Sequence, residues 1–127
     1  MLVSAVIADG PQRRVLEVLA DGLAELLMPE PVPAELRRVL EDKLGPDPPA
    51  IDAILRLLDE LTASTVAVPA EVDAVSGGAD DDRILAAAVA GGAEVLISGD
   101  ARHLLPLGEY RGMRIIRPQG FLASLAG

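Results

Sequence analysis

The chain has 127 residues, which is enough for one domain and too few for two ordinary ones. It contains no cysteine, which excludes disulfides and thiolate metal sites, and its net charge of −9 argues against capture of nucleic acid by bulk electrostatic attraction. No signal peptide and no apolar run of about 20 residues stands out, so we expect one cytoplasmic domain over residues 1–127 with no membrane association.

The first half of the chain predicts helices that are separated by prolines. Residues 12–27 carry leucine and valine at helical spacing and run into a short apolar stretch at 26–28, which is a candidate strand. A second helix is predicted over 36–44, after the proline-rich segment 29–33. A third, strongly amphipathic helix is predicted over 51–61.

The second half of the chain alternates strands with helices. Residues 65–68 are rich in β-branched side chains and predict a strand. A helix from 82 to 90 ends at two glycines and is followed by a short apolar strand at 95–97. A last strand at 114–117 and a helix at 118–125 complete an α/β pattern, which is typical of a mainly parallel sheet.

Carboxylates stand where such a sheet would place a site. Asp80, Asp81 and Asp82 open one predicted helix, Asp100 follows the strand at 95–97, and Glu35 lies on an early helix. Taken singly, these residues are explained as helix-capping, turn and solvated surface groups. Taken together, they are the oxygen ligands that Mg²⁺ or Mn²⁺ prefers, and such sites attack phosphodiesters.

Other site chemistries find little support. His103 is the only histidine, so a zinc site is not expected. The sequence has no phosphate-binding glycine loop, no dinucleotide fingerprint and no serine nucleophile elbow. A receiver-like phosphoacceptor domain needs a lysine late in the chain, and Lys43, the only lysine, lies early.

Several blocks of the chain resemble the PIN domain family, in particular the toxin components of toxin–antitoxin systems. Residues 80–86, 98–100 with 104–105, 115–118 and 121–122 are similar to the second half of that domain, and residues 34–36 with 39–40 are similar to its first-half helix. The resemblance implies a three-layer α/β/α fold. It also implies a Mg²⁺- or Mn²⁺-dependent endoribonuclease that acts on RNA and is restrained by an antitoxin, with self-association as a further expectation.

The resemblance also implies roles for individual residues. Glu35, Asp82 and Asp100 match the family's catalytic and metal-ligating acids. Ser98 matches a residue that orients the last of them, and Asp80 and Asp81 are auxiliary acids. We expect Arg83, Arg102 and His103 to contact RNA phosphates.

The start of the chain departs from the family pattern. PIN domains open with a strand that ends in Asp-Thr-Asn, whereas residues 2–5 resemble the segment after that motif. We therefore expect the first strand to be missing and the domain to be N-terminally truncated. Asp9 and Asp21 are poor substitutes for the first acid, because no strand is predicted before either. Pro31 and Pro33 could displace Glu35.

Two explanations remain open for the missing strand. One is that the gene begins upstream of Met1 and that the native product is an active ribonuclease. Alternatively the chain is a catalytically inactive binding module that associates with an antitoxin or with itself.

Overall fold

A computed structural model describes residues 3–9 and 12–126. This part of the chain forms five α-helices and a six-stranded sheet in the order β3-β2-β1-β4-β6-β5. All neighbouring strands are parallel except β5 and β6. The elements are β1 (Val3–Ile7), α1 (Arg13–Ala20), β2 (Ala24–Pro29), α2 (Val32–Leu44), α3 (Pro48–Leu61), β3 (Thr62–Val66), α4 (Ala79–Ala90), β4 (Val95–Ile97), a 3-10 turn (Leu105–Leu107), β5 (Glu109–Tyr110), β6 (Met113–Ile116) and α5 (Pro118–Ala126).

The prediction that the first strand is missing was wrong. Residues Val3–Ile7 form β1 in the middle of the sheet, where β1 pairs with β2 on one side and with β4 on the other. Ala5 and Val6 are fully buried. A strand that is covered on both faces reads as a short apolar run without alternation, and residues 3–7 have this pattern, as β4 does.

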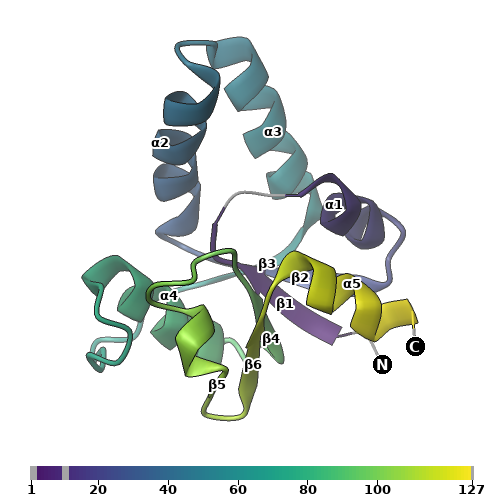
Figure 1. Cartoon of the computed structure of the whole chain (residues 1–127). Helices are drawn as coiled ribbons and strands as arrows, with labels where there is room; N and C mark the ends of the chain where they lie inside the picture. Colours follow the sequence, from purple (N-terminus) through teal and green to yellow (C-terminus); the bar gives the residue numbers. More distant parts are fainter. Residues whose placement is uncertain (1–2, 10–11, 127) are drawn as a thin grey trace.

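The helices cover both faces of the sheet, which confirms the α/β/α fold. Figure 1 shows α4 on one side of the sheet and α1 with α5 on the other. Helix α4 contacts β2 and β3, whereas α1 contacts β2, α3 and α5. Helices α2 and α3 contact each other and stand away from the sheet as a pair.

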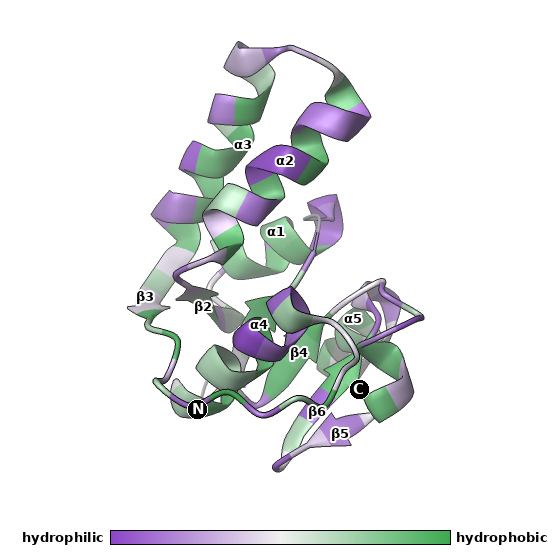
Figure 2. Ribbon diagram, turned by 90° about the vertical axis from the view of Figure 1, so that its left-hand side faces the viewer, coloured by the Kyte–Doolittle hydropathy of each residue, from purple (hydrophilic) through white to green (hydrophobic). Residues whose placement is uncertain are grey.

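The core follows from the hydrophobic pattern of these elements. Figure 2 shows hydrophilic and hydrophobic residues alternating along α2 and α3, whereas β4 is hydrophobic. The largest fully buried side chain is Phe121 on α5, and Ile84 and Leu85 bury one face of α4.

Several predicted elements are confirmed with shifted ends. Helix α4 begins at Ala79 rather than at residue 82, so the three aspartates lie within its first turn. Strand β3 begins three residues earlier than expected, directly after α3. Pro31 and Pro33 occupy the N-cap and the first turn of α2, where proline is tolerated, so they do not interrupt the helix that carries Glu35. In the described part of the chain, no helix is long and apolar enough to span a bilayer.

Candidate active site

The strand order places a crevice at the carboxyl ends of β1 and β4. The chain passes from β1 to β2 on one side of the sheet, and β4 occupies the other side of β1. In open α/β sheets, ligands bind at this change of direction, outside the carboxyl ends of the strands. Ile7 is in register with Ile97, so the segments that follow both strands leave the sheet side by side.

Asp9 and Asp100 lie in this crevice and are joined through Ser98. The Ser98 hydroxyl donates to Asp9 Oδ2 over 3.0 Å and accepts from the Asp100 N–H over 2.9 Å. The Gly99 N–H also donates to the Asp9 carboxylate. Ser98 is fully buried, so its orientation is fixed by its surroundings. Ser98 therefore positions the carboxylate of Asp9 and the backbone of Asp100, and Asp9 stands in the position for which no first acid was predicted from the sequence.

Asp81 and His103 complete a cluster with Asp100. His103 Nδ1 lies 3.1 Å from Asp81 Oδ2 and 3.6 Å from Asp100 Oδ2. Asp100 Oδ1 accepts from the backbone N–H groups of Arg102 and His103, which holds the turn after β4. One potential ligand atom from each of Asp81, Asp100 and His103 falls within 4.8 Å of the other two.

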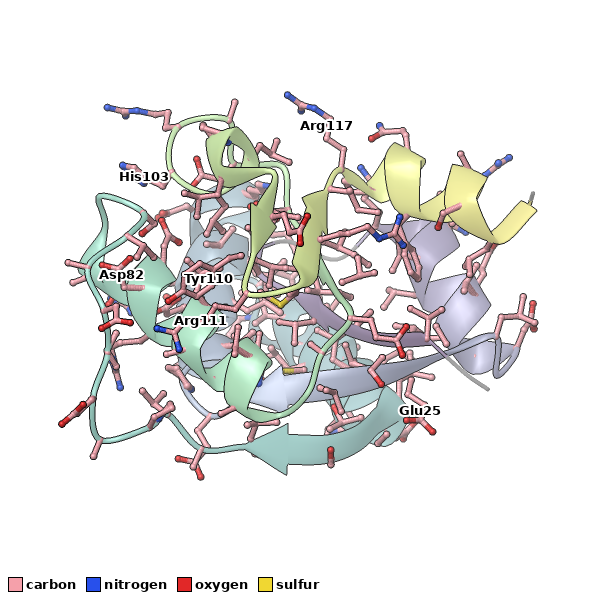
Figure 3. All side chains as sticks on the ribbon, turned by 90° about the horizontal axis from the view of Figure 1, so that it is seen from below. Glu25, Asp82, His103, Tyr110, Arg111 and Arg117 are labelled. Carbon is pink, nitrogen blue, oxygen red and sulfur yellow. The ribbon has the colours of Figure 1, made fainter. Side chains whose placement is uncertain are left out.

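Asp82 points elsewhere and anchors a loop. Its side chain is 8 % exposed, and its Oδ1 accepts three hydrogen bonds, from the Val75 N–H, the Ser76 N–H and the Ser76 hydroxyl. Burial alone would raise the pKa of Asp82, but the hydrogen bonds from Ser76 and Val75 outweigh it and lower the pKa. Figure 3 shows Asp82 at the N-terminal end of α4. The structure thus brings Asp81, and not Asp82, together with Asp100.

Glu35 faces the same site from α2. It lines a hollow of about 520 Å³ together with Asp80, Asp81 and His103. Burial raises the pKa of Glu35, and the negative charge of Asp80 raises it further. The pKa of Asp81 is raised by burial and then by the charge of Asp100. The site therefore gathers carboxylates whose ionised forms repel one another.

The remaining predicted residues lie around this centre. Asp80 is exposed in the first turn of α4, and the helix has no side-chain cap, so none of the three aspartates caps it. Arg83 and Arg102 are exposed and line neither the hollow of Glu35 nor the one beside Asp9. His103, expected to contact RNA, lies among the acids. Asp9 was missed, although an aspartate shortly after an apolar run is the same signal that identified Asp100.

The donor set suits a hard divalent cation. Asp9, Asp81 and Asp100 offer carboxylate oxygens, which Mg²⁺ and Mn²⁺ prefer, and Glu35 shares a hollow with Asp81. Burial is the largest cause of the raised pKa values of Glu35 and Asp81, and the repulsion from neighbouring carboxylates that raises them further is the kind that a bound cation offsets. The residues present therefore fit such an ion.

Comparison with known proteins agrees with this geometry. A family model described as PIN domain matches residues 1–102, a span that includes β1, Asp9, Glu35, Asp81 and Asp100. No curated protein matches the chain. The matched span covers most of the sequence and the whole acidic site, and the chain belongs to the PIN domain family.

Proposed function

We propose that this protein is a divalent-metal-dependent endoribonuclease whose ligands are Asp9, Asp81 and Asp100. The observation that carries the proposal is that Asp9 and Asp100 lie together at the ends of β1 and β4, where Ser98 links them, and that Asp81 meets Asp100 from α4. The nuclease-type fold of the family supports it. The alternative of an inactive binding module depended on a missing first acid, and Asp9 removes that reason.

The residues of the site have different roles in the proposed reaction. When bound, Mg²⁺ or Mn²⁺ would supply Lewis-acid chemistry at the phosphate. Asp9, Asp81 and Asp100 would hold the ion, and the Ser98 hydroxyl would orient the carboxylate of Asp9 and the backbone of Asp100. Glu35, with its raised pKa, is suited to accept a proton from the attacking water at its carboxylate.

The direct test is cleavage of single-stranded RNA by the purified protein with and without Mg²⁺. We expect cleavage with Mg²⁺ or Mn²⁺, none with a chelator, and none by Asp100→Asn. Cleavage that persists in the double variant Asp81→Asn/Asp100→Asn would exclude the proposed site and would indicate a contaminating nuclease.

Removal of the Ser98 hydroxyl is expected to impair catalysis more than folding. Ser98→Ala leaves Asp9 with one donor fewer and leaves the Asp100 N–H without its partner. Partners of this kind behind metal ligands typically contribute about 10–100-fold to activity or metal affinity. Kinetics of RNA cleavage will measure the loss in kcat/KM. Ser124→Ala, which removes a hydroxyl from α5, is the control, and equal activities of the two variants would contradict the role of Ser98.

Neutralisation of Glu35 is expected to stabilise the metal-free protein. A carboxyl group whose pKa is raised by folding binds its proton more tightly in the folded state, so stability falls as pH rises from the ordinary value of 4.5 through the raised one. Glu35→Gln removes this penalty and should raise the Tm at pH 7, by an amount that solvent screening of this partly exposed group keeps small. The gain should vanish below pH 4.5.

The control for this comparison is Glu41→Gln, because Glu41 is exposed on the same helix. Thermal unfolding with a chelator present will measure both variants. A lower Tm for Glu35→Gln at pH 7 would contradict the expectation that the partly buried negative charge of Glu35 beside Asp80 destabilises the metal-free protein.

The biological setting of the nuclease is a further part of the proposal. We infer that the protein acts in the cytoplasm as the toxin of a toxin–antitoxin pair and is held inactive by an antitoxin, or associates with itself. The support is the resemblance of residues 80–86 and 98–105 to such toxins. Expression in bacterial cells should arrest growth, and Asp100→Asn should abolish the arrest. Unimpaired growth with the wild-type protein present would contradict the toxin role.

A further inference from the structure

A second hollow adjoins the acidic site and differs from the first in charge. Its volume is about 490 Å³, and Asp9 and Asp100 form part of its wall. Lys43 from the end of α2 and Arg117, which directly follows β6, also line it. Two of the three proposed metal ligands and two cations thus share one hollow.

The two cations have no competing partner close by. Within residues 3–9 and 12–126, no carboxylate lies within 4.0 Å of the Lys43 ammonium group or the Arg117 guanidinium group. Both side chains are exposed, and Figure 3 shows Arg117 projecting toward the same side of the molecule as His103. Gln12 and Gln119 add amide donors to the wall.

The hollow on the other side of the site could not receive a second phosphate. It is lined by Asp42 and Asp80 in addition to Glu35 and Asp81, with Arg38 as its only arginine. A bound cation would neutralise the phosphate at the acids, but the neighbouring phosphate of the strand needs a positive counterpart of its own. Charge therefore directs the strand toward Lys43 and Arg117.

From this arrangement we propose that Lys43 and Arg117 form a binding subsite for the backbone phosphate next to the scissile one in single-stranded RNA. This subsite rests on the proposed ribonuclease function, since that function places the scissile phosphate at Asp9 and Asp100. It contacts phosphate and no base, so it contributes affinity and direction of the strand, and no sequence preference.

The test is binding of a fluorescent single-stranded oligoribonucleotide to protein that carries Asp100→Asn, measured over a range of salt concentrations with Mg²⁺ present. Each phosphate contact in a single strand contributes about 0.7 to the slope of log K against log salt. Adding Lys43→Ala and Arg117→Ala should reduce the slope by about 1.4 and weaken binding about 10–30-fold at about 0.1 M salt.

The matched control removes two other exposed cations, through Arg56→Ala and Arg114→Ala. Arg56 lies on α3, and Arg114 lies on β6, the strand that directly precedes Arg117, but lines a different hollow. The control should leave affinity and slope unchanged. Equal losses in both double variants, or no loss in either, would overturn the subsite, as would failure of the Asp100→Asn protein to bind RNA.

Cleavage assays separate this inference from the proposed function. With Asp100 intact, Lys43→Ala/Arg117→Ala should raise KM and leave kcat close to the wild-type value. Selective loss of binding in a protein that never cleaves RNA would retain the subsite and exclude the nuclease. Normal cleavage with an unchanged KM would retain the nuclease and exclude the subsite.

Discussion

Asp9→Asn is expected to abolish metal-dependent RNA cleavage while the fold stays intact. The asparagine side chain has the same shape, and its oxygen in the place of Asp9 Oδ2 still accepts from the Ser98 hydroxyl and the Gly99 N–H. It lacks the negative charge with which Asp9 would bind the cation. Because partners behind metal ligands already contribute about 10–100-fold, loss of a ligand should reduce kcat/KM by at least about 100-fold.

Asp21→Asn is the matched control for this experiment. Asp21 is the other carboxylate weighed for the first position, and it lies exposed at the C-cap of α1. We expect wild-type cleavage from this variant and unfolding free energies within about 0.5 kcal/mol for both variants. Substantial activity in Asp9→Asn would show that β1 does not deliver a ligand.

Asp82→Ala is expected to cause the largest loss of stability among the acidic variants. It removes the acceptor of three hydrogen bonds and frees the segment that leads into α4. Hydrogen bonds to a charged group are worth about 1.5–3 kcal/mol, and the freed N–H groups can partly rehydrate. We expect a loss of about 2–3 kcal/mol in the free energy of unfolding and a fall of about 8–11 °C in Tm.

The dependence of the free energy of unfolding on pH tests the role of Asp82 in a second way. The pKa of Asp82 is lowered by folding, so its contribution is present above the ordinary value of 3.8 and is lost as pH falls through the lowered value. The difference in the free energy of unfolding between the wild-type protein and Asp82→Ala should therefore decrease at the lowest pH at which the protein still unfolds cooperatively. An increase of this difference on acidification would contradict the stabilising role of the hydrogen-bonded carboxylate.

Asp81→Ala is the control for the stability of Asp82→Ala. Asp81 is half-buried beside Asp100, and burial and this like charge both raise its pKa. Its removal should leave the metal-free protein as stable as before or slightly more stable. If Asp81→Ala destabilised the fold as much as Asp82→Ala, the assignment of Asp81 to the acidic site and of Asp82 to the anchored loop would be wrong.

The sequence predicted the α/β class and most elements, because periodicity is strong in α2, α3 and α4. It failed at β1, although β1 and β4 have the same apolar pattern. The family pattern of a strand ending in Asp-Thr-Asn predicted that the first strand lies outside the chain, because residues 3–9 lack that motif. The pattern at residues 3–7 followed by Asp9 was sufficient, and only the pairing with β4 establishes its place in the sheet.

The arrangement of the proposed site was predicted in part. Asp100 and Ser98 lie beside Asp9, and Glu35 shares a hollow with Asp81, in agreement with their positions after β4 and on α2. The choice between Asp81 and Asp82 could not be made from sequence. Neighbouring residues of a helix point about 100° apart, so a small shift in the start of α4 decides which one faces the crevice. The hydrogen bonds from Ser76 to Asp82 depend on the path of the loop before α4, and the hydrophobic periodicity of the sequence does not predict that path.

The measurement that tests the central claim most directly is a Mn²⁺ titration of the wild-type protein, Asp81→Asn and Asp82→Asn by calorimetry. The account predicts that the wild-type protein binds Mn²⁺, that Asp81→Asn weakens binding at least about 10-fold, and that Asp82→Asn stays within about 2-fold of wild type. Strong loss in Asp82→Asn with wild-type affinity in Asp81→Asn would contradict the assignment. Failure of the wild-type protein to bind the ion would contradict the metal site itself.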